Sequence, residues 1–211
     1  MKKRRFLRIQ PLPAALLLGM LVFDPDGWVA ATLAAALLHE GGHLLAAYCL
    51  GIPVAALRTD FFGARLEVRG RMLSYGEEWL LSAAGPLTSL LVALAGGLLW
   101  RVSPFFFALS GASILLGIFN LLPIATLDGG RMLEVLLLSI LVPARAEAIL
   151  RLCSFAALFL LWSTAVYILL RTGDGGTLLF FSMSLFLHFF KTAEYGLERI
   201  SADFKEKTSF F

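Results

Sequence analysis

Charged residues are scarce in this chain. Only 16% of its 211 residues are Asp, Glu, Lys or Arg, whereas about 25% is usual in soluble domains. Hydrophobic residues make up 59% of the sequence, and the mean hydropathy is +0.82. This composition excludes an ordinary soluble enzyme and indicates an integral membrane protein, whose apolar surface is covered by the lipid bilayer.

Cysteine is also scarce, since the chain has only Cys49 and Cys153. They lie far apart in the sequence, so neither a disulfide framework nor a cysteine-based metal site is expected. The net charge of +3 is explained by membrane topology, because basic residues gather in connections between apolar runs. A nucleic-acid partner is therefore not expected.

The apolar runs predict an all-α polytopic membrane protein with about six transmembrane helices. A helix needs about 20 residues to cross the hydrocarbon core. The expected spans are residues 12–23, 28–50, 78–100, 105–122, 146–170 and 177–190. With this order of spans, most basic residues fall on one side of the membrane. The positive-inside rule therefore predicts a multi-pass protein of the cell membrane with both termini in the cytoplasm.

A single domain over residues 1–211 is expected, with one short interruption of the helical pattern. Residues 64–69 alternate with period two inside a segment rich in charge, which predicts a small membrane-associated β-hairpin at 54–74, turning near Gly63. The other parts are a core at 11–142, C-terminal spans at 146–190 and a cytoplasmic tail at 191–211.

Two histidines and a glutamate lie together inside the second predicted span. His39, Glu40 and His43 form the pattern HExxH, which on a helix places both imidazoles on one face. Such a pair holds zinc, and the carboxylate beside it serves as a general base. Because ionisable side chains at membrane depth are rare and mark functional sites, the pattern predicts a catalytic zinc site inside the membrane.

A catalytic zinc ion takes three protein ligands, so a third must come from elsewhere. The candidates at membrane segments or their edges are Glu77, Glu78, Asp128, Glu134 and His188. Asp128 is favoured, because a proline and two glycines interrupt the apolar helix around it, and such breaks at membrane depth line a cavity or are buried in protein. Two alternatives stay open: Asp128 caps a helix beginning at Gly129, or one of the two adjacent glutamates is the ligand.

Three motifs follow one another along the chain. They are His39-Glu40-Gly41-Gly42-His43, Ser82-Ala83-Ala84-Gly85-Pro86, and Asn120-Leu121-Leu122-Pro123 continuing to Leu127-Asp128-Gly129-Gly130. In this order they resemble the site-2 proteases, which are zinc intramembrane metalloproteases, and among them the compact branch typified by stage IV sporulation protein FB. The resemblance covers about residues 11–131.

The resemblance implies roles for the matched residues. His39, His43 and Asp128 would hold one zinc ion, with Glu40 as general base. Asn120 would lie near the substrate backbone or the oxyanion. The residues of the structural motifs, which let helices pack closely or break, would be Gly85, Pro86, Pro123, Gly129 and Gly130. The hairpin would receive an unwound substrate segment by strand addition.

The same resemblance implies an activity, namely hydrolysis of a peptide bond in or near a transmembrane segment of a membrane-tethered substrate. Pro-sigma and anti-sigma factors are the substrate classes it suggests, and an inhibitory membrane partner is expected. Neither a PDZ nor a CBS domain is expected in the chain. The alternative function is that of a non-proteolytic metal-binding scaffold or transporter, against which the intact Glu40 argues.

Overall fold

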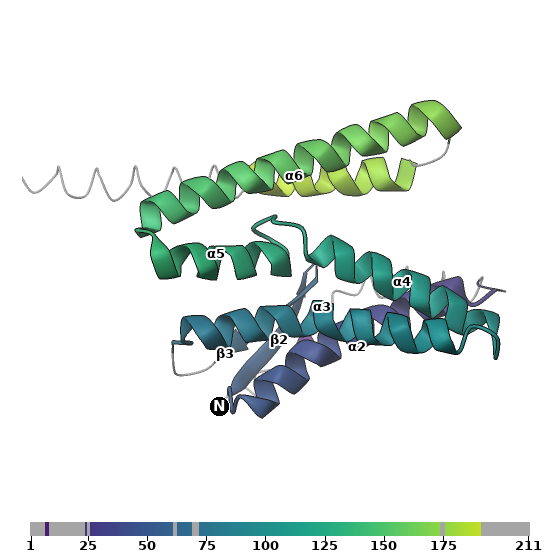
Figure 1. The fold of residues 1–211 in the computed structure, drawn as a ribbon, viewed down its shortest axis with the longest axis horizontal. Helices are drawn as coiled ribbons and strands as arrows, with labels where there is room; N and C mark the ends of the chain where they lie inside the picture. The colour runs from purple at the N-terminus through teal and green to yellow at the C-terminus, as the bar shows by residue number, and fades with distance from the viewer. Residues whose placement is uncertain are drawn as a thin grey trace, which may run out of the picture. The chain divides into compact units, whose positions relative to one another are not determined.

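A computed structural model describes residues 7–8, 24, 26–60, 63–68, 72–173 and 176–190. Six helices lie in these ranges: α2 (Trp28–Cys49), α3 (Tyr75–Leu98), α4 (Pro104–Asn120), α5 (Asp128–Ile140), α6 (Pro143–Thr172) and a C-terminal helix (Gly176–Phe190) (Figure 1). Of these, α2, α3 and α6 are long and apolar enough to cross a membrane. The prediction of a helical membrane protein is therefore confirmed, while the expected span at 12–23 and the tail at 191–211 lie outside the described residues.

Two compact units divide the chain, Met1–Arg151 and Leu152–Phe211. The first unit contains α2 to α5 and the beginning of α6. The second contains the rest of α6 and the C-terminal helix. All three residues of the predicted metal site belong to the first unit.

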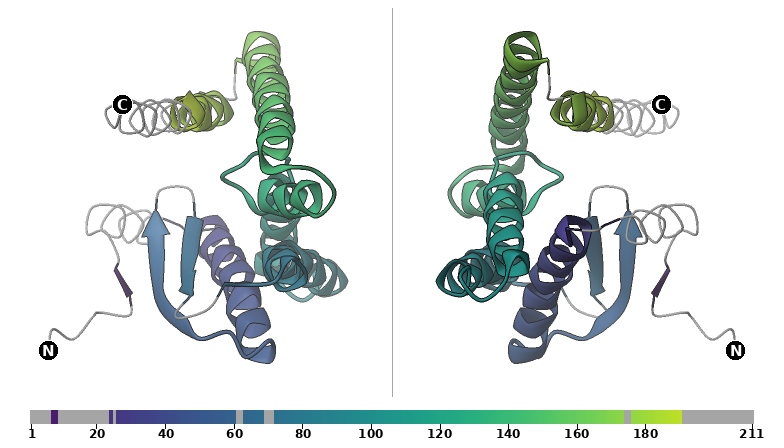
Figure 2. Two further views of the ribbon diagram at one scale, coloured as in Figure 1. Left: turned by 90° about the vertical axis from the view of Figure 1, so that its left-hand side faces the viewer. Right: turned by 90° about the vertical axis from the view of Figure 1, so that its right-hand side faces the viewer.

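A small sheet follows α2 in the first unit. Strands β2 (Val54–Asp60) and β3 (Gly63–Val68) pair antiparallel, and β1 (Leu7–Arg8) pairs in parallel with β2, so the order is β1-β2-β3 (Figure 2). Asp60 lies opposite Gly63 at one end of the pairing. This segment is where the sequence predicts a hairpin, and its association with the membrane or with a substrate stays a prediction.

Small residues bring α2, α3 and α4 close together. Ala31 and Ala35 of α2 form a buried cluster with Ala108 and Leu109 of α4. A methyl group added at Gly96 of α3 would lie 2.9 Å from a backbone carbonyl oxygen of α4. Such close approach suits a membrane protein, in which van der Waals packing replaces the hydrophobic effect as the force between helices.

The helix starts follow from local sequence. Ser74 and Glu77 form a capping box at the start of α3, where the serine hydroxyl accepts from the Glu77 amide and the carboxylate accepts from the Ser74 amide. Ser103 caps α4, and Pro104 occupies its first turn, where the missing amide hydrogen costs nothing. Both helices thus begin slightly earlier than the apolar runs that predict them.

The apolar helix predicted near residue 120 breaks where the sequence indicates. Helix α4 ends at Asn120, and α5 begins at Asp128. A side chain at Gly129 would press against the Leu122 carbonyl oxygen at 2.7 Å, and one at Gly130 would meet the Ala125 amide nitrogen at 2.7 Å. The two glycines are needed because the connecting loop folds back tightly on the first turn of α5.

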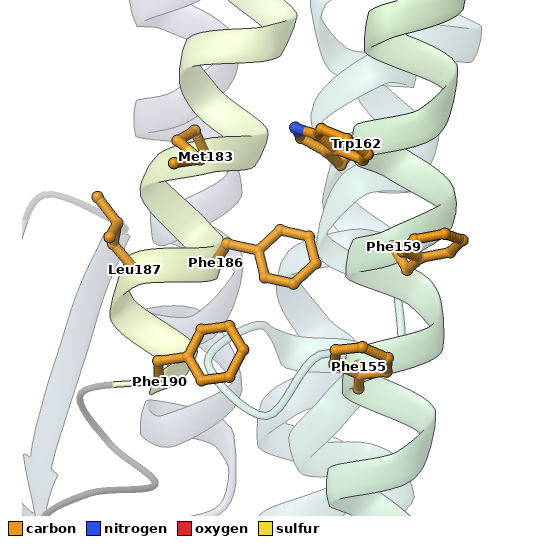
Figure 3. Close-up of a pocket in the computed structure, with 7 residues that line it drawn as sticks. All are labelled: Phe155, Phe159, Trp162, Met183, Phe186, Leu187 and Phe190. Atoms are coloured by element: carbon orange, nitrogen blue, oxygen red, sulfur yellow. The ribbon is translucent and has the colours of Figure 1, made fainter.

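An apolar pocket of about 480 Å³ lies within the second unit. It is lined by Phe155, Phe159, Trp162, Met183, Phe186, Leu187 and Phe190 (Figure 3). The rings of Phe155 and Phe186 meet edge to face across it, with centroids 6.1 Å apart. Its lining offers no carboxylate or imidazole, so the pocket has none of the groups that acid–base or metal chemistry requires.

Candidate metal centre

Two helices bring the three predicted ligands together. His39 and His43 lie one turn apart on α2, both buried, and Asp128 begins α5. The Oδ2 atom of Asp128 lies 3.1 Å from His39 Nε2 and 3.3 Å from His43 Nε2. Among the described residues, this is the group of His, Cys, Asp and Glu side chains whose ligand atoms all lie within 4.8 Å of one another.

The spacing between the Asp128 oxygen and the two imidazole nitrogens fits a zinc ion. Zinc binds imidazole nitrogen and carboxylate oxygen at about 2.0 to 2.2 Å in tetrahedral geometry, which places neighbouring ligand atoms about 3.3 Å apart. The two nitrogen–oxygen distances of 3.1 and 3.3 Å agree with that value. In the part of the chain that the structure describes, the group offers two nitrogens and one oxygen, and three protein ligands are the number found in catalytic zinc sites.

Hydrogen bonds from α3 orient both imidazoles for metal binding. His43 Nδ1 lies 2.7 Å from the carbonyl oxygen of Leu81, which can only accept, so Nδ1 donates and Nε2 keeps its lone pair. His39 Nδ1 lies 2.8 Å from Ser89 Oγ and donates there in the tautomer that frees its own Nε2. Two nitrogen lone pairs and a carboxylate then face one another, an arrangement that a cation stabilises.

The alternatives for the third ligand are not favoured by the geometry. Asp128 is the first residue of α5 and not its cap, since Leu127 occupies the cap position without a side-chain hydrogen bond. Glu77 is held in the capping box with Ser74, and Glu78 forms an ion pair with Arg131 at 3.0 Å. Neither glutamate belongs to the group around the two histidines.

Glycine lets α3 approach the two histidines. A side chain at Gly85 would lie 2.7 Å from His39 Nε2 and 2.6 Å from His43 Cε1. The opposite helix has the same requirement, because a side chain at Gly42 would lie 2.8 Å from the Ala84 carbonyl oxygen of α3. Close packing of α3, expected for Gly85 and its neighbour Pro86, therefore brings its backbone directly onto the metal ligands.

The remaining candidate residues lie around this centre in different ways. Glu40 is half-buried and next to His39 on α2, where a general base would be needed. Asn120 donates from Nδ2 to the Leu116 carbonyl oxygen of its own helix at 3.0 Å, so its role near substrate stays a prediction. Glu134 and His188 are not in the metal group.

Three contacts of the site were not predicted from the sequence. They are the contact of the Ser89 hydroxyl with His39, that of the Leu81 carbonyl with His43, and the close packing of α3 against Gly42. Ser89 is 1% exposed, and its place seven residues after Ser82 gives no sign of a contact with His39. A methyl group at Gly117 of α4 would lie 3.2 Å from the Ser89 Cβ. The serine is thus held between two helices that are distant in sequence from the histidine it supports.

Replacing Ser89 with alanine should weaken zinc binding by about 10- to 100-fold, the usual effect of losing a hydrogen bond that orients a metal-binding histidine. Zinc affinity can be measured by competition with a chelator. Ser113→Ala is the matched control, because Ser113 is also fully buried and its hydroxyl has no hydrogen-bond partner. Equal affinity of the Ser89→Ala variant and the wild type would contradict the prediction.

Parts of the chain are similar in sequence to a peptidase family and to a zinc metalloprotease. Residues 98–161 match the model of peptidase family M50. Over 112 residues the chain is 32% identical to "Putative zinc metalloprotease Rip3" from the Erdman and H37Rv strains of Mycobacterium tuberculosis. That match covers 48% of this chain, which spans only 28% of the length of this relative.

The fold resembles that of a solved protease. The site-2 protease from Methanocaldococcus jannaschii superposes with a TM-score of 0.60 and 20% identity, covering 90% of this chain and 93% of that chain. The segment that matches the family model contains Asp128, the residue that completes the metal group begun by His39 and His43. Residues 98–161 are thus similar to peptidase family M50, and the fold of the chain is similar to that of a site-2 protease.

Proposed function

We propose that this protein is a zinc-dependent intramembrane endopeptidase. The observation that carries the proposal is that Asp128 of α5 meets His39 and His43 of α2. Glu40 lies beside these histidines, and α2 is apolar enough to span a membrane. A purely structural zinc site would be closed by four protein ligands. Three ligands and an adjacent carboxylate are instead the set that hydrolysis requires.

The expected position of the site supports cleavage inside the bilayer. From Trp28 to His39 the helix rises about 16 Å, near the middle of a hydrocarbon core about 30 Å thick. A peptide bond that reaches this depth belongs to a membrane-embedded segment. Water must also reach the site, so a polar path from one membrane face is part of the proposal.

Each residue of the site has a part in the proposed mechanism. His39, His43 and Asp128 would hold the zinc ion, which would supply Lewis-acid polarisation of a peptide carbonyl. The Glu40 carboxylate takes a proton from the attacking water and passes it to the nitrogen of the leaving amine. Ser89 and the Leu81 carbonyl keep the two imidazoles oriented while this happens. Asn120 is assigned the contact with the substrate backbone or the oxyanion, which requires that its side chain leave the Leu116 carbonyl.

The substrate is proposed to be a transmembrane segment of a membrane-tethered protein. A substrate helix must unwind near the cut, because its own hydrogen bonds shield the carbonyl under attack. Strand β3 lies at the edge of the described sheet, so it could pair with the unwound segment by strand addition. Within the family, the compact branch of stage IV sporulation protein FB is the proposed place of this chain. Pro-sigma or anti-sigma factors are the proposed substrates, with both termini cytoplasmic and an inhibitory membrane partner.

Replacing Glu40 with glutamine should lower cleavage by about 10²- to 10⁴-fold, the usual contribution of a general base, while zinc stays bound. Membrane peptides from cells carrying the wild type or the Glu40→Gln variant can be compared by mass spectrometry. Peptides that accumulate uncut in the variant identify the substrate. If the variant processes the same peptides as the wild type, the protease assignment fails and a metal-binding scaffold or transporter is favoured.

A further inference from the structure

We propose that Glu78 and Arg131 are positioning residues of the metal site, whose ion pair holds the start of α5 against α3 so that Asp128 reaches both histidines. The inference rests on the metal site of the proposed function. Its test measures metal binding and not proteolysis. Failure of this inference is therefore distinguishable from failure of the proposed function.

The ion pair joins the two helices close to the third ligand. Arg131 Nη2 donates to Glu78 Oε1 at 3.0 Å. Arg131 lies in the same first turn of α5 as Asp128, and Glu78 lies in the first turn of α3. A contact three residues from Asp128 restrains both the rotation of α5 about its axis and its position along α3.

Helix α3 orients the other two ligands, His39 and His43. The Leu81 carbonyl accepts from His43, and Ser89 contacts His39. Gly85 lies between them, directly against both imidazoles. Glu78, Leu81, Gly85 and Ser89 follow one another at spacings of three or four residues, which places them along one face of a helix. Through Arg131, Glu78 extends this face to the third ligand.

Asp128 needs such a restraint more than the histidines do. His39 and His43 are fixed relative to each other by one continuous helix. Asp128 instead follows an irregular loop and begins a helix of 13 residues, which is too short to span a membrane alone. The planar guanidinium of arginine holds a carboxylate in a defined orientation better than a lysine ammonium does.

Overall stability is expected to depend little on this ion pair. The side chains of Arg131 and Glu78 are 39% and 34% exposed, and exposed ion pairs contribute little to folding because solvent screens them. A positioning role therefore predicts different effects on metal binding and on folding stability. Removing either charge should weaken metal binding without an equal loss of stability in the metal-free protein.

The test is a double-mutant cycle on the purified full chain. Zinc affinity is measured by chelator competition for the wild type, Glu78→Gln, Arg131→Gln and the double variant. Each single change should weaken zinc binding by about tenfold. The double variant should be no weaker than the poorer single one, because both changes remove the same contact. The absorption spectrum of bound Co²⁺, which reports ligand geometry, should change in the same variants, and Arg131→Lys should recover part of the affinity.

A second ion pair provides the control. Glu147 and Arg151 pair within α6, so Glu147→Gln and Arg151→Gln should leave zinc affinity and the Co²⁺ spectrum unchanged. Wild-type affinity in Glu78→Gln and Arg131→Gln would overturn the inference, as would additive losses in the double variant. A large loss for Glu78→Gln alone would instead make Glu78 a ligand. Failure of the wild-type protein to bind zinc would overturn the proposed function itself.

Discussion

Replacing Gly85 with alanine should weaken zinc binding by more than about 100-fold, which exceeds the usual effect of losing a contact that only orients a ligand. The added methyl group would lie 2.6 Å from His43 Cε1 and 2.7 Å from His39 Nε2, where no real side chain fits. Neither ring can move aside easily, because His39 is held by Ser89 and His43 by the Leu81 carbonyl. The helices α2 and α3 must therefore separate, and the histidines lose their alignment with Asp128.

Equilibrium dialysis against buffered zinc, followed by metal analysis of the protein, measures this effect. Gly41→Ala is the matched control, since Gly41 lies in α2 beside the same motif and nothing is within 4 Å of the added methyl group. Alanine favours a helix over glycine by about 1 kcal/mol, so this control should bind zinc normally and unfold at an equal or higher temperature. Normal zinc binding by Gly85→Ala would show that the close approach of α3 is not required.

Replacing Asp128 with asparagine should also remove most of the bound zinc. The amide keeps the size of the carboxylate but loses the negative charge that balances the cation, and zinc sites use carboxylate, imidazole or thiolate ligands. Without the third ligand, the two histidines alone should bind zinc weakly. Because zinc would supply the polarisation of the peptide carbonyl in the proposed reaction, the proposed cleavage should be lost together with the metal.

Metal content of the purified Asp128→Asn protein at a fixed free zinc concentration tests this prediction. Glu77→Gln is the control, since Glu77 is another candidate ligand but is engaged in the capping box of α3. A glutamine can form the same box, so the control should retain both its fold and its zinc. If Glu77→Gln lost zinc and Asp128→Asn did not, the third ligand would have to be reassigned.

Much of the helical architecture could be predicted because the bilayer demands long apolar helices. The runs at 28–50 and 78–100 became α2 and α3 with shifts of a few residues at their ends. The shift at α3 arises from the Ser74 and Glu77 capping box, a hydrogen-bonding device that an apolar run does not reveal. Helix α5 was indicated only by the break around Asp128, since it is too short and too polar to read as a span.

The site was predictable where its members share one helix. His39 and His43 are four residues apart, so helix geometry alone places them on one face. Asp128 could be favoured from the broken helix around it, but its distance from the histidines depends on how α5 packs against α3. The contacts of Ser89 and of the Leu81 carbonyl with the histidines could not be predicted from sequence. Serine is common in membrane helices, and every residue has a backbone carbonyl, so neither group is distinctive in a sequence.

The scarcity of charge, the apolar runs and the HExxH pattern determined by themselves that this is a membrane protein with a metal site in its second predicted span. Those properties are local, since they follow from helix periodicity and from the cost of burying charge in lipid. Tertiary structure alone decided the completion of the site. Close packing at Gly42 and Gly85 brings α3 against the two histidines. The loop between α4 and α5 then directs the Asp128 carboxylate toward them. Contacts between segments so distant in sequence depend on the shapes of the packed helices, which no local pattern contains.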